Sequence, residues 1–283
     1  MLRHVATSIA FGSFLAMVTA CGSGAGDGGT PTVDESLEGS QPFVLVPTTL
    51  LAMLDASVGG KTGVDTPQGK NLIGAFHPPV AVVADPATLR SLSDAEYRSG
   101  LTEAVKHGFI TDTGYLAWIE ASTTALLARD LATLEVLIRR SVEIKAGVVA
   151  SDEREAGTRA MLNAGHTVAH ALEQVSGYQL LHGEAVGLGL IAECVMAGRA
   201  GILPSGADQR IAALLSRLGL PVRVPFRTRA EPIRHAMGRD KKNLAGAIRF
   251  AVPLEIGKMG PRNGSWTVGF DESTIDAGLA AIL

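Results

Sequence analysis

Three histidines fall within one short stretch of the sequence, MLNAGHTVAHALEQVSGYQLLHGEA, which runs from Met161 to Ala185. His166 and His170 are four residues apart, so their side chains share one face if the segment is a helix. His182 opens the next segment with helical periodicity, and a helix–loop–helix return can bring it back to the same point. Neutral imidazole is a common zinc ligand, and a carboxylate often supplies the third ligand of a catalytic site. The stretch therefore predicts a metal site, although spacing alone does not indicate which two histidines bind or which acidic residue completes the set.

Two further groups of polar residues have the pattern of an anion-binding site. Lys61, Lys70 and Asn71 lie in the Gly-flanked segments SVGGKTG and QGKNLIG. Glycine lets the backbone approach a ligand closely, and lysine neutralises phosphate as a point charge. The GGKTG segment lacks the spacing of a P-loop, which excludes a nucleoside triphosphatase of that class. Glu103 and Lys106 lie three residues apart in LTEAVKHG, a spacing that by itself is typical of a solvated ion pair.

The composition limits the kind of protein that the chain can be. Its 283 residues suffice for one large domain or two ordinary ones, and 46% of them are apolar, so a sizeable core is expected. A net charge of −3 and an aromatic content of 5% argue against a nucleic-acid partner. The two cysteines, Cys21 and Cys194, cannot form a disulfide framework, and Cys194 lies in an apolar run typical of a core thiol.

The first 41 residues differ from the rest of the chain. Residues 1–21 combine a short basic start, an apolar run too short for a comfortable membrane span, and small residues before Cys21. They predict a secretory signal peptide, or a lipoprotein-like signal with a lipidated Cys21, and the alternative is a mis-called start. Residues 22–41 are rich in Gly, Ser, Thr and Asp without periodicity, which predicts a flexible linker.

Strand-like patterns come before helical ones in the remaining chain. Residues 43–46 predict a short strand and residues 80–85 a buried one, with a Gly-rich loop between them at 57–74. From Pro86 onward, apolar residues recur at three- and four-residue spacing, which predicts a succession of helices.

The helical part contains one segment that is apolar nearly all round. Residues 182–201 therefore predict a central, buried helix. Near the end of the chain, 248–258 and 265–270 predict a pair of strands. The expected architecture is a small β-containing start followed by a large helical domain.

Taken together, several stretches resemble the 3-dehydroquinate synthase family of the sugar phosphate cyclase superfamily. They are VPTTLLAMLDASVGGKTGVDTPQGKNLIGAFHPP, GLTEAVKHG, DEREAGTRAMLNAGHTVAHALE, HGEAVGLG and RDKKN, and they follow one another in the family's order. The resemblance covers about residues 42–270. It implies a dehydroquinate synthase-like fold, in which an α/β remnant of the NAD-binding domain at 42–85 is followed by a mainly α-helical metal- and substrate-binding domain at 86–283.

The resemblance also implies a role for each residue that matches a family motif. The zinc ligands are Glu103, His166 and His182, whereas His170 faces the substrate without binding the metal. Asp55 lies near the reacting carbon and the nicotinamide. The remaining catalytic residues, which hold the substrate's carboxylate, hydroxyls and phosphate, are Lys61, Asn71, Lys106, Lys145, Arg159, Asn163, Lys241 and Lys242. The cofactor contacts are Thr48, Thr49, Asp55, Lys61, Lys70, Asn71, Thr88, Leu89, Arg90 and Ser91.

The activity implied by the resemblance is that of a phosphate-eliminating lyase. It converts 3-deoxy-arabino-heptulosonate 7-phosphate to 3-dehydroquinate in the shikimate pathway of aromatic amino acid biosynthesis. Zn²⁺, or Co²⁺ on the same ligands, acidifies a substrate hydroxyl, and NAD takes and returns a hydride. The resemblance further implies a homodimer in the cytoplasm. A membrane anchor through Cys21 is the alternative if residues 1–21 are a genuine signal.

The sequence departs from the family before residue 42. We find no match there to the family's Gly-rich loop for the NAD pyrophosphate or to its acidic residues for ribose, and Gly39 stands near the position of an expected arginine. We therefore expect weaker NAD binding and reduced turnover, with unpaired edges and exposed apolar faces on the strands at 43–46 and 80–85. A mis-started gene of a cytoplasmic enzyme would account for this departure.

Three other functions remain open from the sequence. The first is a secreted or lipid-anchored metal-binding relic without turnover, and the second is a sister cyclase that makes an inosose or a valiolone. The third is an iron-type alcohol dehydrogenase, against which GGKTG and RDKK argue. Arg159, Asn163 and His170 together favour the dehydroquinate enzyme over the sister cyclases.

Overall fold

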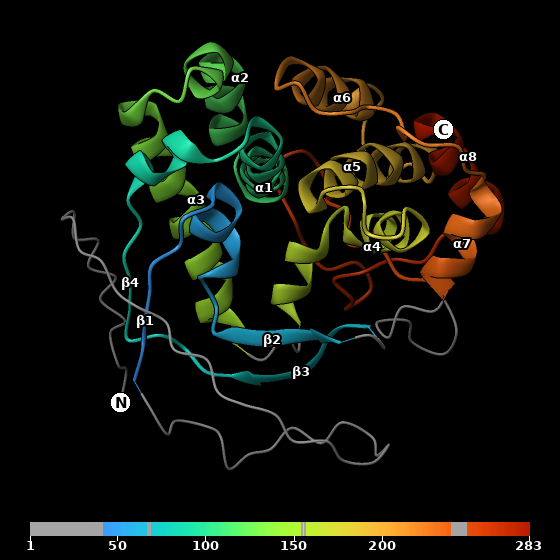
Figure 1. Ribbon diagram of the computed structural model, residues 1–283. Coiled ribbons are helices and arrows are strands. Elements are labelled where there is room, and N and C mark those ends of the chain that lie inside the picture. Colours follow the sequence, from blue (N-terminus) through green and yellow to red (C-terminus); the bar gives the residue numbers. More distant parts are fainter. Residues whose placement is uncertain (1–41, 67–68, 154, 156, 239–247) are drawn as a thin grey trace.

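The computed structural model describes residues 42–66, 69–153, 155, 157–238 and 248–283, without the side chains of 64–73. The predicted signal at 1–21 and linker at 22–41 thus lie outside the described residues. A strand-containing part comes first and a helical body follows (Figure 1). In the described ranges, no helix has both the length and the apolar character needed to cross a membrane.

Two small sheets form the strand-containing part. β1 (Val44–Leu45) pairs in parallel with β4 (Ala81–Val82). β2 (Lys61–Thr66) and β3 (Gly69–Phe76) form an antiparallel hairpin. Between β1 and β2 the chain forms a short π-helical turn, η2 (Ala52–Ala56), which contributes buried side chains to the core.

The segment predicted as a Gly-rich loop at 57–74 is largely the β2–β3 hairpin, so that prediction was wrong. The register aligns Lys61 with Phe76 and Gly63 with Gly74. Pairing satisfies backbone N–H and C=O groups that an open loop would leave to water, which favours a hairpin over a loop.

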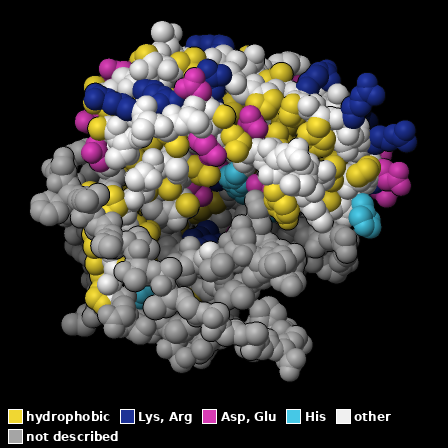
Figure 2. All heavy atoms as spheres, in the orientation of Figure 1, with side chains coloured by type: hydrophobic (Ala, Val, Ile, Leu, Met, Phe, Trp, Pro, Cys, Tyr) yellow, Lys and Arg dark blue, Asp and Glu magenta, His cyan; other side chains and the backbone are white. Residues whose placement is uncertain are grey.

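The β1–β4 pair confirms the two predicted strands but not the burial of the second. Val80 is 68% exposed and Val44 is 51% exposed, because no third strand among the described residues covers or extends this pair. Figure 2 shows a strip of hydrophobic side chains at the left, on the side where Figure 1 places β1 and β4. The expected exposed apolar face is therefore present.

The helices predicted from Pro86 onward are confirmed. Their bounds are η3 (Pro86–Ser91), α1 (Asp94–Thr111), α2 (Thr113–Leu127), α3 (Leu131–Ser151), η4 (Thr158–Asn163), α4 (His166–Val175), α5 (His182–Arg199), α6 (Ala207–Arg217), α7 (Ala230–Gly238) and α8 (Glu272–Ile282). Side chains of Ser93, Asp112, Asp130 and Asp271 accept backbone N–H groups at the starts of α1, α2, α3 and α8. Such N-caps explain why these helices begin where they do.

α5 lies at the centre of the helical body, as its apolar composition predicts. It packs against α1, α4, α6 and α8 (Figure 1). Most of its residues are buried, and Cys194 is a buried free thiol, as expected. A helix in this position can present the side chains at its ends to the helices that surround it.

The predicted strand pair near the C-terminus is reduced to a single antiparallel bridge between Phe250 and Val268. Pro253 lacks a backbone N–H and cannot donate to a ladder, which accounts for the interruption of the first segment.

Candidate active site

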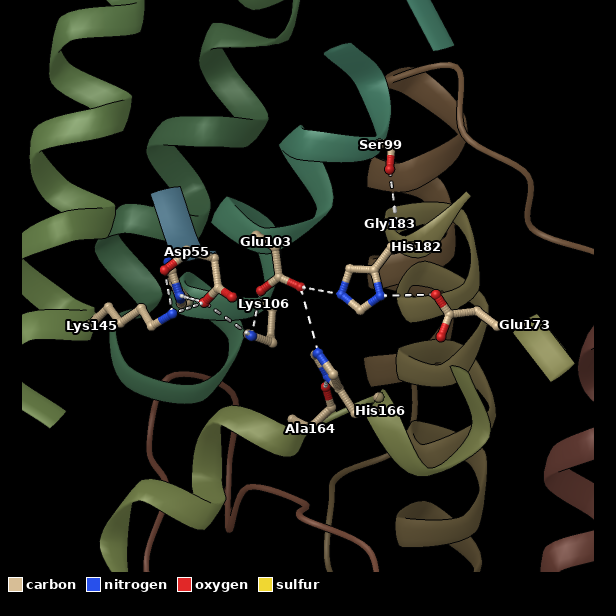
Figure 3. Close-up of polar contacts among 12 residues, drawn as sticks. Asp55, Ser99, Glu103, Lys106, Lys145, Ala164, His166, Glu173, His182 and Gly183 are labelled. Carbon is tan, nitrogen blue, oxygen red and sulfur yellow. Dashed lines mark hydrogen bonds and ion pairs between the residues drawn. The ribbon is translucent and has the colours of Figure 1, made fainter. Parts of the chain in front are cut away.

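Three helices bring together one carboxylate and two imidazoles. Glu103 comes from α1, His166 from the first position of α4 and His182 from the first position of α5. One ligand atom from each of them lies within 4.8 Å of the other two. Nε2 of His182 is 3.5 Å from Oε1 of Glu103, and Nε2 of His166 is 3.8 Å from the same oxygen (Figure 3). The helix–loop–helix return expected from the sequence therefore brings His182 back to His166.

His170 lies beside this group rather than in it. Its ring contacts that of His166 edge-on, with centroids 5.6 Å apart, because the two residues are one turn apart on α4. The group of mutually close ligand atoms contains His166 and His182. The geometry thus places His166 and His182 in the group of ligand atoms and His170 beside it, a distinction that the sequence spacing left open.

The other ring nitrogen of each imidazole in the group has its own partner. Nδ1 of His166 lies 3.1 Å from the carbonyl oxygen of Ala164, and Nδ1 of His182 lies 3.2 Å from Oε1 of Glu173. Figure 3 shows the His182 ring between the carboxylates of Glu103 and Glu173. These contacts turn both Nε2 atoms toward Glu103, an arrangement typical of metal-bound histidines. Sequence reasoning missed Glu173, although its spacing of seven from His166 puts it on the same face of α4.

A tight contact between α1 and α5 fixes His182 relative to Glu103. The Ser99 hydroxyl, one turn before Glu103, accepts a hydrogen bond of 2.9 Å from the N–H of Gly183. A Cβ at Gly183 would lie 1.8 Å from the Ser99 carbonyl oxygen, so only glycine fits there. The two helices therefore meet backbone to backbone beside the site.

The Glu103–Lys106 pair is buried, with side-chain exposures of 0% and 1%, so the interpretation as a solvated ion pair is wrong. The reason is that α1 faces the core on nearly every side over this turn. Lys106 pairs with Oε2 of Glu103, which leaves Oε1 facing the imidazoles. Burial opposes ionisation of Glu103, but Lys106 and the two imidazoles hold its pKa well below the usual range.

Asp55 links two buried lysines. Its Oδ1 lies 2.7 Å from Nζ of Lys145 and 4.0 Å from Nζ of Lys106. Burial raises the pKa of Asp55, but the two ammonium groups outweigh this effect and lower it. Burial lowers the pKa of Lys145 and the Asp55 carboxylate opposes the change. The structure thus places Asp55, Lys106 and Lys145, all predicted site residues, next to the imidazoles.

The protonation state of His182 depends on its two carboxylate neighbours. Burial by itself lowers the pKa of this imidazole, but Glu103 and Glu173 raise it to about 9. For His166, burial and the charge of Lys106 hold the pKa well below the usual value, so this ring is neutral.

His107 is a buried imidazole that sequence reasoning did not single out. Neither ring nitrogen has a hydrogen-bond partner among the described residues, and Nε2 lies 3.9 Å from Oδ1 of Asp55. Burial, together with Lys106, lowers its pKa to about 4, so the ring is neutral. Asp55, Glu103 and His107 also offer three close ligand atoms. The ammonium groups around Asp55 disfavour a cation there, which leaves the first group as the better metal site.

A second cluster of predicted substrate contacts forms around Glu155. Its carboxylate pairs with Lys61 and accepts a 2.7 Å hydrogen bond from Nδ2 of Asn163. Arg159 is 3% exposed, and its guanidinium donates to the carbonyl oxygens of Glu153 and Gly59. No separate pattern in the sequence pointed to Glu155, which has a left-handed backbone conformation with φ of 58°.

The predicted cofactor contacts divide into described and undescribed positions. Thr48 is exposed, and the Thr49 hydroxyl accepts the N–H of Ala52. Thr88, Leu89, Arg90 and Ser91 lie on η3, where Leu89 is fully buried and could offer a cofactor only its backbone. The side chains of Lys70 and Asn71, and all of Lys241 and Lys242, lie outside the described residues.

The face shown in Figure 2 is hollowed near its centre, and histidine and basic side chains are visible at the wall of the hollow.

Two family models match the chain. The model of the 3-dehydroquinate synthase C-terminal domain matches residues 100–243. The 3-dehydroquinate synthase N-terminal model matches residues 16–99, so that similarity begins before Pro42, where the motif resemblance starts.

Two solved structures of cyclases are similar over most of the chain. A 2-epi-5-epi-valiolone synthase from Streptomyces hygroscopicus subsp. jinggangensis 5008, with NAD⁺ and Zn²⁺ bound, has 28% identity and a TM-score of 0.75. The match covers 85% of this chain and 66% of that one. A 2-deoxy-scyllo-inosose synthase, complexed with carbaglucose-6-phosphate, NAD⁺ and Co²⁺, has 25% identity and a TM-score of 0.79, with coverages of 86% and 67%. The chain spans about two thirds of the length of these proteins.

A maleylacetate reductase from Agrobacterium tumefaciens shares the fold alone, at 13% identity and a TM-score of 0.55 over 87% of this chain and 68% of that one. The small strand-containing start and the helical body are thus a dehydroquinate synthase-like fold. Because the C-terminal family model covers more than half of the 283 residues and the N-terminal model adjoins it, the chain belongs to the 3-dehydroquinate synthase family.

Proposed function

We propose that the protein is a sugar phosphate cyclase with 3-dehydroquinate synthase activity. It would convert 3-deoxy-arabino-heptulosonate 7-phosphate to 3-dehydroquinate and phosphate, with NAD and one Zn²⁺ or Co²⁺ ion. The observation that carries the proposal is the group of Glu103, which is buried, with the partly buried His166 and His182, directly beside the Asp55, Lys106 and Lys145 cluster. A metal site next to buried ammonium groups suits an anionic, polyhydroxylated substrate.

The three ligands fit a tetrahedral cation. Two ligands that each lie about 2.1 Å from zinc at the tetrahedral angle are about 3.4 Å apart. The Nε2 atoms of His182 and His166 lie 3.5 and 3.8 Å from Oε1 of Glu103, so small shifts would complete the geometry. Oε2 of Glu103 pairs with Lys106, whereas Oε1, which faces the imidazoles, accepts no hydrogen bond within the described part of the chain. A buried carboxylate with this property is suited to a metal.

The residues around the ligands would bind and orient the substrate. When bound, the metal would supply Lewis acidity to substrate hydroxyls, and NAD would accept and return a hydride. Lys106 and Lys145 would offset negative charge at the reacting end, where Asp55 holds their ammonium groups in place. Lys61 and Asn163 would exchange their contacts with Glu155 for contacts with the substrate. His170, next to His166, would move a proton or position the phosphate.

Arg159 supports a substrate that carries a carboxylate. Its guanidinium is buried, and two backbone carbonyls fix its plane. A fixed, planar arginine matches a carboxylate better than it matches a hydroxyl. The second candidate, a sister cyclase acting on a sugar phosphate without a carboxylate, is favoured by the valiolone and inosose synthases among the similar structures.

The proposal extends to the organisation and setting of the protein. Residues 42–85 would belong to the NAD-binding part, with 86–283 as the metal- and substrate-binding domain. The protein would act in the shikimate pathway, in the cytoplasm and as a homodimer. A lipid anchor at Cys21 is the alternative location.

The test is phosphate release by the full chain with Zn²⁺ and excess NAD. The substrates are heptulosonate 7-phosphate and, as a matched control, glucose 6-phosphate, which lacks the carboxylate. Release from the heptulosonate alone supports the proposal, and release from the control alone supports a sister cyclase. Zinc binding without release from either substrate would contradict 3-dehydroquinate synthase activity and point to the metal-binding relic or to a cyclase of another sugar phosphate.

A further inference from the structure

The N-cap residue of α4 provides no side chain to cap the helix. Its N-cap residue is Gly165, which has φ of 79° and no side chain to accept a backbone N–H. His166 is the first residue of the helix, so whatever fixes this helix end also fixes a proposed metal ligand.

Glu193, on the neighbouring helix α5, supplies the missing cap. Its Oε2 accepts a hydrogen bond of 2.7 Å from the N–H of Gly165. The N–H groups of Thr167 and Val168 also act on this carboxylate, since they lower its pKa. The side chain is 2% exposed, and the unpaired N–H groups and dipole of a helix start favour a carboxylate in this place.

One face of α5 connects this cap with the metal site. His182, Val186, Gly189 and Glu193 are spaced by four, three and four residues, so their positions lie on one side of the helix. A Cβ at Gly189 would lie 2.0 Å from the carbonyl oxygen of Gly165, so the two backbones touch there. The face of α5 that carries His182 therefore also packs against the start of α4, which carries His166.

Burial of this carboxylate is costly in itself. Oε1 of Glu193 accepts no hydrogen bond within the described residues, and burial raises the pKa of the group to about 8 although the three N–H groups oppose the shift. An apolar side chain would avoid the desolvation of a carboxylate. A role beyond core packing would account for its presence.

We propose that Glu193 is a positioning residue of the metal site, because it fixes the start of α4 against α5 and so sets the separation of His166 from His182. This inference rests on the proposed function, in which both histidines are metal ligands. Glu193 acts through the backbone of α4 and contacts none of the proposed ligand atoms.

The test compares zinc affinity, measured by competition with a chelator, among full-length variants. Glu193→Gln removes the ionisable group but keeps one acceptor oxygen, Glu193→Ala removes the cap, and Cys194→Ala is the matched control. Cys194 is the next buried residue of α5 and lines a cavity with Pro204 and Asp208, away from the start of α4. We expect zinc to bind about 10-fold more weakly to the Gln variant and about 100-fold more weakly to the Ala variant. The absorption spectrum of bound Co²⁺ should change in both variants, and the control should stay within about 2-fold of wild type.

A second readout separates positioning from stability. The melting temperature of each variant is measured with the metal removed by a chelator. Glu193 variants that melt earlier but keep the wild-type zinc affinity and Co²⁺ spectrum would overturn the inference. If Glu193→Ala does not fold, zinc affinity and the Co²⁺ spectrum are measured on Glu193→Gln and Gly189→Ala instead. Gly189→Ala forces α5 away from the start of α4 at Gly165. Wild-type protein that binds no zinc would overturn the proposed metal site as well, whereas wild-type-like binding by the variants overturns the role of Glu193 alone.

Discussion

Removal of the Glu173 carboxylate should weaken metal binding without a change in any proposed ligand. Glu173 is 3% exposed, and its Oε1 lies 3.2 Å from Nδ1 of His182. This contact holds the imidazole with Nε2 toward Glu103, at 3.5 Å. Without it the ring, whose side chain is 27% exposed, can rotate away from the other ligands.

The magnitude follows from what such orienting partners contribute in metal sites, which is about 10- to 100-fold in affinity. That range corresponds to about 1.4 to 2.7 kcal/mol. Glu173→Gln keeps an oxygen that can accept the Nδ1–H, so we expect a loss near 10-fold. Glu173→Ala leaves no acceptor and opens a space in the core, so we expect a loss near 100-fold.

Proton competition must be separated from ligand orientation in this assay. Glu173 helps to raise the pKa of His182 to about 9, so its removal lowers that pKa and favours the neutral imidazole at pH 7. This change by itself would strengthen zinc binding and mask part of the loss. Zinc affinity should therefore be measured at about pH 9.5, where the ring is largely neutral in every variant. Gln174→Ala, an exposed position on the same helix, is the matched control. Zinc affinity of Glu173→Ala within about 2-fold of this control would refute the orienting role.

Three further predictions concern the same site. Glu103→Gln leaves the buried ammonium of Lys106 with the 4.0 Å contact to Asp55 as its one remaining ion pair among the described residues, so the free energy of unfolding should fall by about 3 kcal/mol. Adding Lys106→Met should restore part of this loss, and an unchanged denaturation midpoint in Glu103→Gln would argue against a buried pair. Zinc affinity should rise about 10-fold from pH 7 to 8 and about 5-fold from pH 8 to 9, because one proton must leave His182, whose pKa of about 9 lies above the usual value. Calorimetry in buffers of different ionisation enthalpy should detect that proton at pH 7, and no release would contradict the shift. Gly183→Ala should separate α5 from α1 and weaken zinc binding, because its Cβ would lie 1.8 Å from the Ser99 carbonyl, and wild-type affinity would show that the contact yields elsewhere.

Local patterns sufficed for much of the helical body. The three- and four-residue periodicity predicted its helices, and the apolar composition of 182–201 predicted the burial of α5, since a helix without a polar face has no side to offer to water. The four-residue spacing of His166 and His170 predicted their shared face, and the short connection to His182 predicted its return. Each of these predictions depends on interactions within a few turns.

Contacts between distant segments were not predictable in this way. Glu103 precedes His166 by 63 residues, so only the family resemblance assigned it to the ligand set. The burial of Lys106 and His107 depends on helices that pack around α1, and the cap that Glu193 provides depends on the neighbouring α4. The hairpin within 57–74 was missed because its many glycines and polar residues are equally typical of a loop.

The most direct test of the metal site measures the zinc content of purified wild-type protein and of His182→Ala and His170→Ala. One zinc per chain is expected in the wild type and in His170→Ala, because His170 lies outside the group of ligand atoms. A folded His182→Ala variant should retain none. Stoichiometric zinc in His182→Ala, or its loss from a folded His170→Ala variant, would contradict the assignment of Glu103, His166 and His182 as the ligands.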